Sequence, residues 1–354
     1  MCSWLSARKK RETKERSFLK NGGQILEELI ASCDGKCNPI QTFSEKELNR
    51  ATNNYNQDRI LFMDWGYALY KGNYRDRNIL VKKYLCKLEN HNEICTVLDG
   101  TVNEIVIGSQ MNHKNVLKLL GYCLETQIPI QVYEFAPHGD LYSQVCASEP
   151  DKPSILTTQL TLNWENRLRI ATEVADAITY LHMAGSRPII HRDIKPSNIF
   201  LDQHCVAKLS DFTHSIRIPL GEMHVKDDIR GTFGFIAPEY CKTGLITEKA
   251  DVFSFGMLLL EILMGRTPLN FQHPAEDLDF TFWEHVRSFV ENNPLSMIVE
   301  PAILEEKGIE EQLQAFTKLA MRCIPGAAEE RPTMMEVAKE LRQIRRCLSP
   351  VPAQ

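Results

Sequence analysis

The chain has 354 residues, 43% of them hydrophobic and 25% charged, which is enough to bury a full core as one two-lobed domain or two smaller ones. A formal net charge of −5 excludes a general attraction to nucleic acid, because such binding needs a strongly basic face. The sequence has neither an apolar run long enough to span a membrane nor a signal-peptide core, so we expect a cytosolic protein. The 11 cysteines are expected to be thiols rather than zinc ligands, including Cys33 and Cys37.

Residues 1–42 are predicted to form a basic N-terminal extension with a short helix. The segment ARKKRETKER, at 7–16, is basic and compatible with a helix, and ILEELIAS, at 25–32, predicts a short helix. Two interpretations of the basic segment stay open. Either residues 1–20 make peripheral contact with the anionic inner face of the plasma membrane, with acylation of Cys2 as a second anchor, or the segment is a solvated arm.

Residues 43–136 are predicted to form a lobe built mainly from a sheet. Short bursts of alternating apolar residues, with a turn at GNYRDRN, predict strands from 59 to 84, and QVYEF, at 131–135, predicts another strand. A helix is predicted to begin after Ser44, because Ser44 and Glu47 have the spacing of a capping box.

Residues 137–348 are predicted to form a larger helical lobe, followed by a tail at 349–354. The apolar residues of NWENRLRIATEVADAITYLH, at 163–182, have the spacing of one helical face. The segment KADVFSFGMLLLEILMG, at 249–265, is apolar nearly all round, as expected of a buried central helix. The polar stretch at 148–161 predicts a loop or insertion.

Four short motifs follow one another in a fixed order along the chain. Each alone is a weak signal, because a triplet such as His-Arg-Asp arises often by chance. The four together, across a strand-rich and then a helix-rich region, are highly specific. The motifs are ILVKK (79–83), HRDIKPSNIFL (191–201), SDF (210–212) and GTFGFIAPEY (231–240).

With these motifs, the sequence resembles the eukaryotic protein kinases over about residues 43–345. The segments FSEKELNRATNNY, NHKNVLKLLGYCLET, VYEF and RPTM resemble the plant receptor-like and wall-associated kinases. The finer resemblance is to small cytoplasmic plant kinase-like proteins that serve as adaptors for nucleotide-binding leucine-rich-repeat (NLR) immune receptors. The resemblance implies an α+β, bilobal protein-kinase fold, with a small antiparallel sheet, one main helix, a hinge near 134–137 and a large helical lobe.

By this resemblance, the lobe of residues 43–136 would hold ATP through one lysine. Lys82 would pair with the α- and β-phosphates, and Glu104 would fix Lys82 by an ion pair. The alternative lysine is Lys83, which lies one position further along and would face the opposite side of the strand.

The resemblance also implies a serine/threonine-type catalytic loop, in the pattern DxKxxN at 193–198. Asp193 would accept the proton of the substrate hydroxyl, and Lys195 would steady the γ-phosphate. Asn198 and Asp211 would hold Mg²⁺. An alternative is that Asp193 and Asp211 are hydrogen-bond hubs of the fold rather than chemical groups.

The activation segment has no phosphate acceptor within residues 216–231, which contain no Ser, Thr or Tyr. In related kinases, the arginine at the position of Arg192 pairs with a phosphorylated residue of this segment. Asp227 and Asp228 either supply standing negative charge toward Arg192 or Arg230, or form an exposed acidic turn. The resemblance assigns structural roles to Asp251 and to the pair of Glu239 with Arg331.

The segment ILFMDWGYALYKG, at 60–72, departs from the glycine-rich loop that covers the phosphates in this family. Backbone N–H groups must approach phosphate without a Cβ in the way, so bulky or acidic side chains here are predicted to weaken ATP binding. The residues at the family's glycine positions are Phe62, Asp64, Trp65 and Tyr67.

Two further departures concern the adenine slot and the magnesium segment. Leu80 replaces the small residue above adenine, and Phe200 replaces the residue below it, so the slot is predicted to be narrowed. The alternative is that neighbours shift outward and the slot survives. Thr213 replaces the glycine after Asp211 and Phe212, and its β-branched side chain is predicted to hinder the pivoting of this segment.

The departures predict a pseudokinase, and the resemblance implies that it acts as an adaptor in plant innate immune signalling. The partners implied by the resemblance are an NLR immune receptor, other receptor-like cytoplasmic kinases and a pathogen effector that modifies the protein. The alternative is an active or weakly active serine/threonine kinase that uses ATP and Mg²⁺, because all six family side chains are retained. The expected location is the cytoplasm, or the inner face of the plasma membrane.

Overall fold

The computed structural model describes residues 2–32, 40–64, 66–85, 91–146, 160–183, 185–267 and 282–346. The chain divides into two compact units. The first unit contains Met1–Gly139 and also Asp211–His214, and the second contains most of the chain after Asp140. The predicted loop at 148–161 lies almost wholly outside the described residues, as do Cys33 and Cys37.

The first unit is built on a six-stranded sheet, as predicted for the sheet-rich lobe. Its order is β1-β5-β6-β4-β3-β2, and every neighbouring pair is antiparallel except β1 with β5. The strands are β1 (Gln41–Thr42), β2 (Ile60–Met63), β3 (Tyr67–Tyr74), β4 (Arg77–Tyr84), β5 (Leu119–Cys123) and β6 (Ile130–Glu134).

Three helices accompany this sheet, namely α1 (Cys2–Ser32), α2 (Glu45–Ala51) and α3 (His91–Gln110), with a short 3-10 turn at Gln57–Arg59. The predicted capping box is confirmed, because Ser44 and Glu47 exchange side-chain and backbone hydrogen bonds at the start of α2. Helix α2 ends at Ala51, and the next turn places Asn53, Asn54 and Tyr55 at positive φ.

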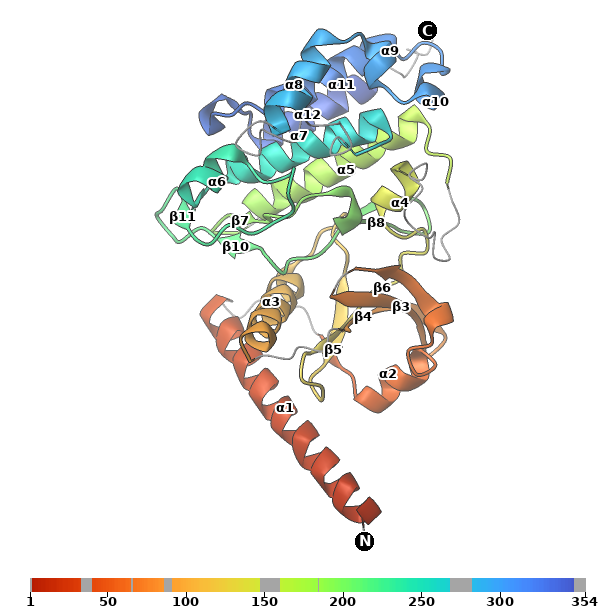
Figure 1. Ribbon diagram of the computed structural model, residues 1–354, viewed down its shortest axis with the longest axis vertical. Helices are drawn as coiled ribbons and strands as arrows, with labels where there is room; N and C mark the ends of the chain where they lie inside the picture. The colour runs from red at the N-terminus through yellow and green to blue at the C-terminus, as the bar shows by residue number, and fades with distance from the viewer. Residues whose placement is uncertain are drawn as a thin grey trace, which may run out of the picture. The chain divides into compact units, whose positions relative to one another are not determined.

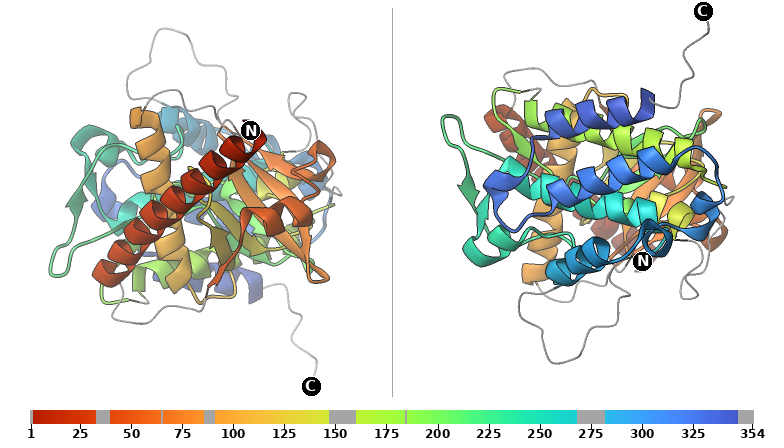
Figure 2. Two further views of the ribbon diagram at one scale, coloured as in Figure 1. Left: turned by 90° about the horizontal axis from the view of Figure 1, so that it is seen from below. Right: turned by 90° about the horizontal axis from the view of Figure 1, so that it is seen from above.

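The prediction of a short helix at 25–32 was wrong, because α1 is one helix of 31 residues. It crosses α3 on the outside of the first unit (Figures 1 and 2). Asn21 is buried and donates hydrogen bonds to the carbonyl oxygens of Leu124, at 3.3 Å, and Thr126, at 3.0 Å. Ile25 is also buried. These contacts hold the helix across Gly22 and Gly23, which disfavour a helix by about 1 kcal/mol each.

The second unit is mainly helical, as predicted. Helix α7 (Glu248–Met264) is buried along nearly its whole length, and α5 (Trp164–Met183) and α11 (Glu310–Cys323) pack against it (Figure 2). The other helices are α4 (Leu141–Val145), α6 (Pro238–Thr243), α8 (Phe282–Asn292), α9 (Leu295–Ile298), α10 (Pro301–Leu304) and α12 (Met334–Arg346), with 3-10 turns at Pro196–Asn198 and Ala328–Glu330.

Short antiparallel strand pairs position the loops of this unit. They are β7 (Ile189–Ile190) with β10 (Ile216–Arg217), β8 (Ile199–Leu201) with β9 (Ala207–Leu209), and β11 (Val225–Lys226) with β12 (Leu245–Ile246). The buried Arg331 binds Glu239 in a bidentate pair, with N–O distances of 2.7 and 2.5 Å. This pair has the structural role that the sequence predicted for it.

Candidate functional site

The pair of Lys82 and Glu104 lies at the centre of the first unit. Lys82, on β4, donates to Glu104, on α3, with Nζ 2.8 Å from Oε2 and 3.1 Å from Oε1. Both side chains are almost fully buried. Lys83 lies on the opposite side of β4, with its Nζ 3.7 Å from the centroid of the Tyr55 ring. The lysine that pairs with Glu104 is therefore Lys82.

Glu104 accepts hydrogen bonds from three further side chains. Gln131 donates to it at 2.8 Å, Tyr133 at 2.7 Å and Thr213 at 3.2 Å. A buried carboxylate is expensive unless its oxygens are satisfied, and these contacts together with Lys82 satisfy both oxygens. Burial and the nearby Glu104 carboxylate raise the pKa of Tyr133 well above its usual value, so this phenol stays a donor.

Asp211 belongs to the same compact unit as Lys82. Its Oδ2 lies 3.4 Å from Lys82 Nζ, and its Oδ1 accepts from the backbone N–H of Thr213 at 3.2 Å. Burial opposes ionisation of Asp211, but Lys82 and Thr213 outweigh it and hold the pKa of the carboxyl below its usual value. Likewise, burial opposes the charge on Lys82, and Asp211 and Glu104 together raise its pKa.

The segment at the position of the glycine-rich loop is a tight hairpin. Asp64 N–H donates to Tyr67 O at 3.0 Å, Met63 pairs with Ala68, and Leu85 N–H donates to Gly66 O at 2.9 Å. Trp65 lies outside the described residues.

The ring of Tyr67 covers Lys82, whose Nζ lies 4.4 Å from the ring centroid. The Tyr84 centroid is 5.9 Å from the same Nζ, and the rings of Phe62 and Tyr84 lie 6.0 and 5.8 Å from that of Tyr67. An ammonium group above an aromatic face is stabilised by the ring quadrupole. Glu104, Asp211 and the Tyr67 ring thus surround the Lys82 ammonium, and the Lys82 side chain is 4% exposed.

The sequence identified Tyr67 as a departure but did not predict this contact. A signal for it was present, because β3 and β4 pair Tyr67 with Tyr84 and Leu69 with Lys82. Side chains two positions apart on a strand share a face, so the register places Tyr67 and Lys82 on one side of the sheet.

Leu80 and Phe200 lie in different units. Leu80 is 1% exposed on β4, where it pairs with Tyr133 across the sheet. Phe200 is 4% exposed on β8, paired with Lys208 and bridged to Asp140. Their predicted positions on two sides of an adenine slot stay a prediction, as does the shared binding of magnesium by Asn198 and Asp211.

The second unit assembles the predicted catalytic loop. Asn198 Nδ2 donates to Asp193 Oδ2 at 2.8 Å, and Lys195 Nζ lies 3.1 Å from the same oxygen. Thr232 Oγ1 donates to Asp193 Oδ1 at 2.6 Å and accepts from Lys195 at 2.7 Å. Asp193 is therefore a hydrogen-bond hub, and the same arrangement orients its carboxylate as a catalytic base would need. Thr232 was not predicted to be part of this cluster.

Asp251 fixes the start of the loop from within α7. It is fully buried and accepts from the backbone N–H groups of His191, at 2.8 Å, and Arg192, at 2.9 Å, and it pairs with His182 Nε2 at 2.9 Å. Burial opposes its ionisation, and its contacts to His182 and the backbone hold the pKa of the carboxyl below its usual value. The structural role predicted for Asp251 agrees with these contacts.

Arg192 binds the activation segment through an acidic side chain. Its Nη1 lies 2.7 Å from Asp227 Oδ2, and its Nη2 donates to the carbonyl oxygen of Asp228 and to the hydroxyl of Tyr240. Asp227 N–H donates to Gly244 O at 3.1 Å, which ties the segment to β12. Of the two alternatives left open by the sequence, the ion pair is the one present. Tyr240 was not identified beforehand.

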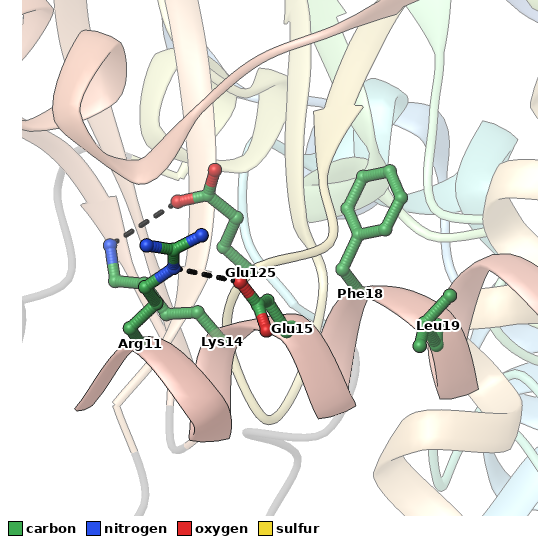
Figure 3. A pocket seen from close by; sticks show the side chains of 6 residues that line it. All are labelled: Arg11, Lys14, Glu15, Phe18, Leu19 and Glu125. Atoms are coloured by element: carbon green, nitrogen blue, oxygen red, sulfur yellow. Dashed lines mark hydrogen bonds and ion pairs between the residues drawn. The ribbon is translucent and has the colours of Figure 1, made fainter. Parts of the chain in front are cut away.

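A shallow pocket of about 410 Å³ lies elsewhere in the first unit, along α1 (Figure 3). Its charged side chains are already paired in part, with Lys14 3.2 Å from Glu125 and Arg11 2.9 Å from Glu15. The lining is completed by Phe18 and Leu19. It contains none of the residues predicted to bind ATP.

Two searches of the described part of the chain were negative. No cluster of three or more His, Cys, Asp or Glu side chains is arranged to hold a metal ion within the described residues. None of the described helices combines the length and the apolar character needed to cross a membrane.

Comparison with known proteins identifies the family to which these motifs and contacts belong. Residues 68–341 match the protein kinase domain family. The chain is 39% identical over 346 residues to the Arabidopsis thaliana protein named non-functional pseudokinase ZED1, covering 95% of this chain and 98% of that protein. It is 38% identical over 349 residues to serine/threonine-protein kinase ZRK1 of the same plant, covering 97% and 96%.

A second group of relatives is longer than this chain. The chain is 39% identical over 340 residues to wall-associated receptor kinase-like 1 of Arabidopsis thaliana, covering 95% of this chain but only 44% of that protein. Protein kinase domains in general use ATP and Mg²⁺. From the family match and these identities, together with the paired Lys82 and Glu104, the chain belongs to the protein kinase family.

Proposed function

We propose that this protein is a pseudokinase, a kinase-fold scaffold that does not transfer phosphate at a significant rate. The observation that carries the proposal is the ring of Tyr67 over Lys82, with Nζ 4.4 Å from the ring centroid. Phosphoryl transfer depends on holding the phosphates and neutralising their charge. A lysine already covered by a ring and paired with Glu104 and Asp211 offers no free face to a phosphate.

The scaffold would serve as an adaptor in plant innate immune signalling. Support comes from the similarity to a protein named non-functional pseudokinase, which extends over nearly the whole of both chains. In this proposal the adaptor bridges an NLR immune receptor and other receptor-like cytoplasmic kinases, and a pathogen effector modifies it. It would act in the cytoplasm or at the inner face of the plasma membrane, reached through residues 1–20.

The second candidate is an active or weak serine/threonine kinase. The observation in its favour is the ordered loop in which Asn198, Lys195 and Thr232 all contact the Asp193 carboxylate. The pairing of Arg192 with Asp227 also supplies, without phosphate, a negative charge at the activation segment.

The two candidates are separated by melting and transfer measurements on the purified full chain. The scaffold predicts that magnesium-ATP at millimolar concentration leaves the melting midpoint unchanged and that phosphate transfer stays at background. An active kinase saturated with ATP at 100 times its dissociation constant would gain about 2.7 kcal/mol, and Asp193→Asn would abolish its transfer. A rise of several degrees with transfer sensitive to Asp193→Asn would refute the scaffold.

The adaptor role needs its own experiment. In plant cells that depend on this protein for an NLR-triggered response, the full chain and its Asp193→Asn variant are expected to restore the response equally and to co-purify with the same receptor. Loss of the response in the variant, with receptor binding retained, would favour the kinase. Failure of both chains to bind an NLR receptor would contradict the adaptor role.

A further inference from the structure

Helix α3 has a glycine where the neighbouring chain comes unusually close. A Cβ on Gly100 would lie 2.6 Å from Thr213 Cγ2, which is closer than two non-bonded carbon atoms approach each other in proteins. Glycine within a helix is unfavourable by about 1 kcal/mol relative to alanine. Gly100 therefore forms a notch in α3 that admits the methyl group of Thr213.

The hydroxyl of Thr213 makes a second contact with the same helix. Its Oγ1 donates to Glu104 Oε2 at 3.2 Å, one turn along α3 from Gly100. Asn103 Nδ2 donates to Phe212 O at 3.0 Å and also contacts Thr213 O at 3.4 Å. Gly100, Asn103 and Glu104, on one face of α3, thus contact the two consecutive residues Phe212 and Thr213.

The remaining contacts come from within the segment and from β4. Asp211 has a φ of 64°, which is unfavourable for a residue other than glycine, so neighbouring contacts must compensate for it. Its Oδ1 accepts from Thr213 N–H and its Oδ2 lies beside Lys82. Phe212 is 2% exposed. All these groups belong to the first compact unit.

We propose that Thr213 and Gly100 form a latch that keeps Asp211, Phe212 and Thr213 docked on α3 by protein contacts alone. The Thr213 methyl group fits the notch at Gly100. The Thr213 hydroxyl donates a hydrogen bond to the Glu104 carboxylate, which also pairs with Lys82. Because the contacts of Phe212 and Thr213 with α3 are made by groups of the chain itself, we expect the segment to keep one position whatever the magnesium concentration. This inference does not rest on the proposed function, because an active kinase could contain the same latch.

The latch is tested by adding a methyl group at position 100, by removing the methyl group of Thr213, and by combining the two changes. Gly100→Ala is expected to lower the melting midpoint by several degrees, because the new Cβ meets Thr213 Cγ2. Thr213→Ser, which removes that methyl and keeps the hydroxyl, is expected to lower it slightly. The double variant is expected to melt well above Gly100→Ala, which is the signature of a direct pairwise contact. A double variant no more stable than Gly100→Ala overturns the proposal.

A matched control lies on the same helix. A Cβ on Gly108 would be 3.6 Å from Leu119, an ordinary contact, so Gly108→Ala should leave the midpoint unchanged or raise it. If Gly100→Ala and Gly108→Ala change the melting midpoint by the same amount, the notch has no role and the proposal fails.

Hydrogen exchange tests whether the segment is fixed. In the full chain, backbone amides of residues 210–216 are expected to exchange equally slowly with magnesium chloride and with a chelator. Thr213→Gly is expected to speed this exchange by about tenfold or more. Magnesium-dependent protection in the unaltered chain, or unchanged exchange in Thr213→Gly, would overturn the latch.

Discussion

Tyr67 lies with its ring over the Lys82 ammonium, at 4.4 Å from centroid to Nζ, in the hairpin where the kinase family has glycines. Tyr67 is a residue of β3, where it pairs with Tyr84 of β4, so its position over Lys82 is set by the sheet. Lys82, which the resemblance assigns to phosphate binding, is a buried residue of this protein, with 3% of its surface exposed.

Uncovering Lys82 should restore access to phosphate. We expect a variant with glycine at positions 62, 64 and 67 and with Leu80→Ala to gain a melting shift with magnesium-ATP that the unaltered chain lacks. Phe62→Gly alone should give no shift, because the Phe62 ring contacts Tyr67 rather than Lys82. Differential scanning fluorimetry with circular dichroism as a folding check measures this. A well-folded multiple variant that still ignores ATP would contradict our account of the loop.

The Lys82 cluster should contribute to stability. Lys82→Met leaves the Glu104 carboxylate buried and the Asp211 carboxylate partly buried without their cation, and breaking a buried pair costs about 3 to 5 kcal/mol. Lys83→Met is the matched control, because Lys83 is half-buried over Tyr55 and holds no buried carboxylate. Chemical denaturation of both variants measures the difference. Equal stability of the two would show that the ion pair has little effect on the fold.

The activation segment should depend on one of its two adjacent aspartates. Asp227→Ala removes the carboxylate that Arg192 binds at 2.7 Å, so we expect faster proteolysis within residues 216–231. Asp228→Ala should have much less effect, because Asp228 contacts Arg192 through its backbone carbonyl. Limited proteolysis with mass spectrometry compares them. Equal cleavage in both variants would mean that the ion pair does not hold the segment.

The contribution of the Lys82 cluster should not change with pH near neutrality. The raised pKa of Lys82 means that its contribution is complete below the ordinary value of 10.5 and is lost as the pH rises through its folded value. The pKa values of Tyr67 and Tyr84 are raised by burial, so neutral phenols are favoured and their contribution is lost above the ordinary value of 10.0. The lowered pKa of Asp211 gives a contribution that is complete above 3.8 and lost as the pH falls below it.

These signs define a plateau between about pH 4 and 10. In the unaltered chain, the contribution of this cluster to the free energy of unfolding should stay constant from about pH 5 to 9 and shrink on either side of the plateau. Denaturation curves of the unaltered chain at a series of pH values provide the measurement. A loss of stability that begins between about pH 8 and 9, inside the plateau, would contradict the raised pKa values of Lys82, Tyr67 and Tyr84.

The amino-acid sequence by itself determined the order of elements and the family. The period-two pattern predicted β3 and β4, the helical spacing predicted α5 and α7, and the capping box of Ser44 and Glu47 predicted the start of α2. These features are local, because each depends only on residues of the same helix or strand, which are close together in the sequence. The resemblance indicated Lys82, with Lys83 as the alternative, and Glu104 as the partner, and the contact with Glu104 decided for Lys82.

Only the tertiary structure decided what surrounds these residues. The length of α1 depends on the burial of Asn21 and Ile25 against other segments, which local propensity across two glycines did not reveal. The notch at Gly100 has meaning only once Thr213 lies in it. Contacts between segments far apart in the chain depend on backbone geometry and close packing, and a local sequence pattern predicts neither of these.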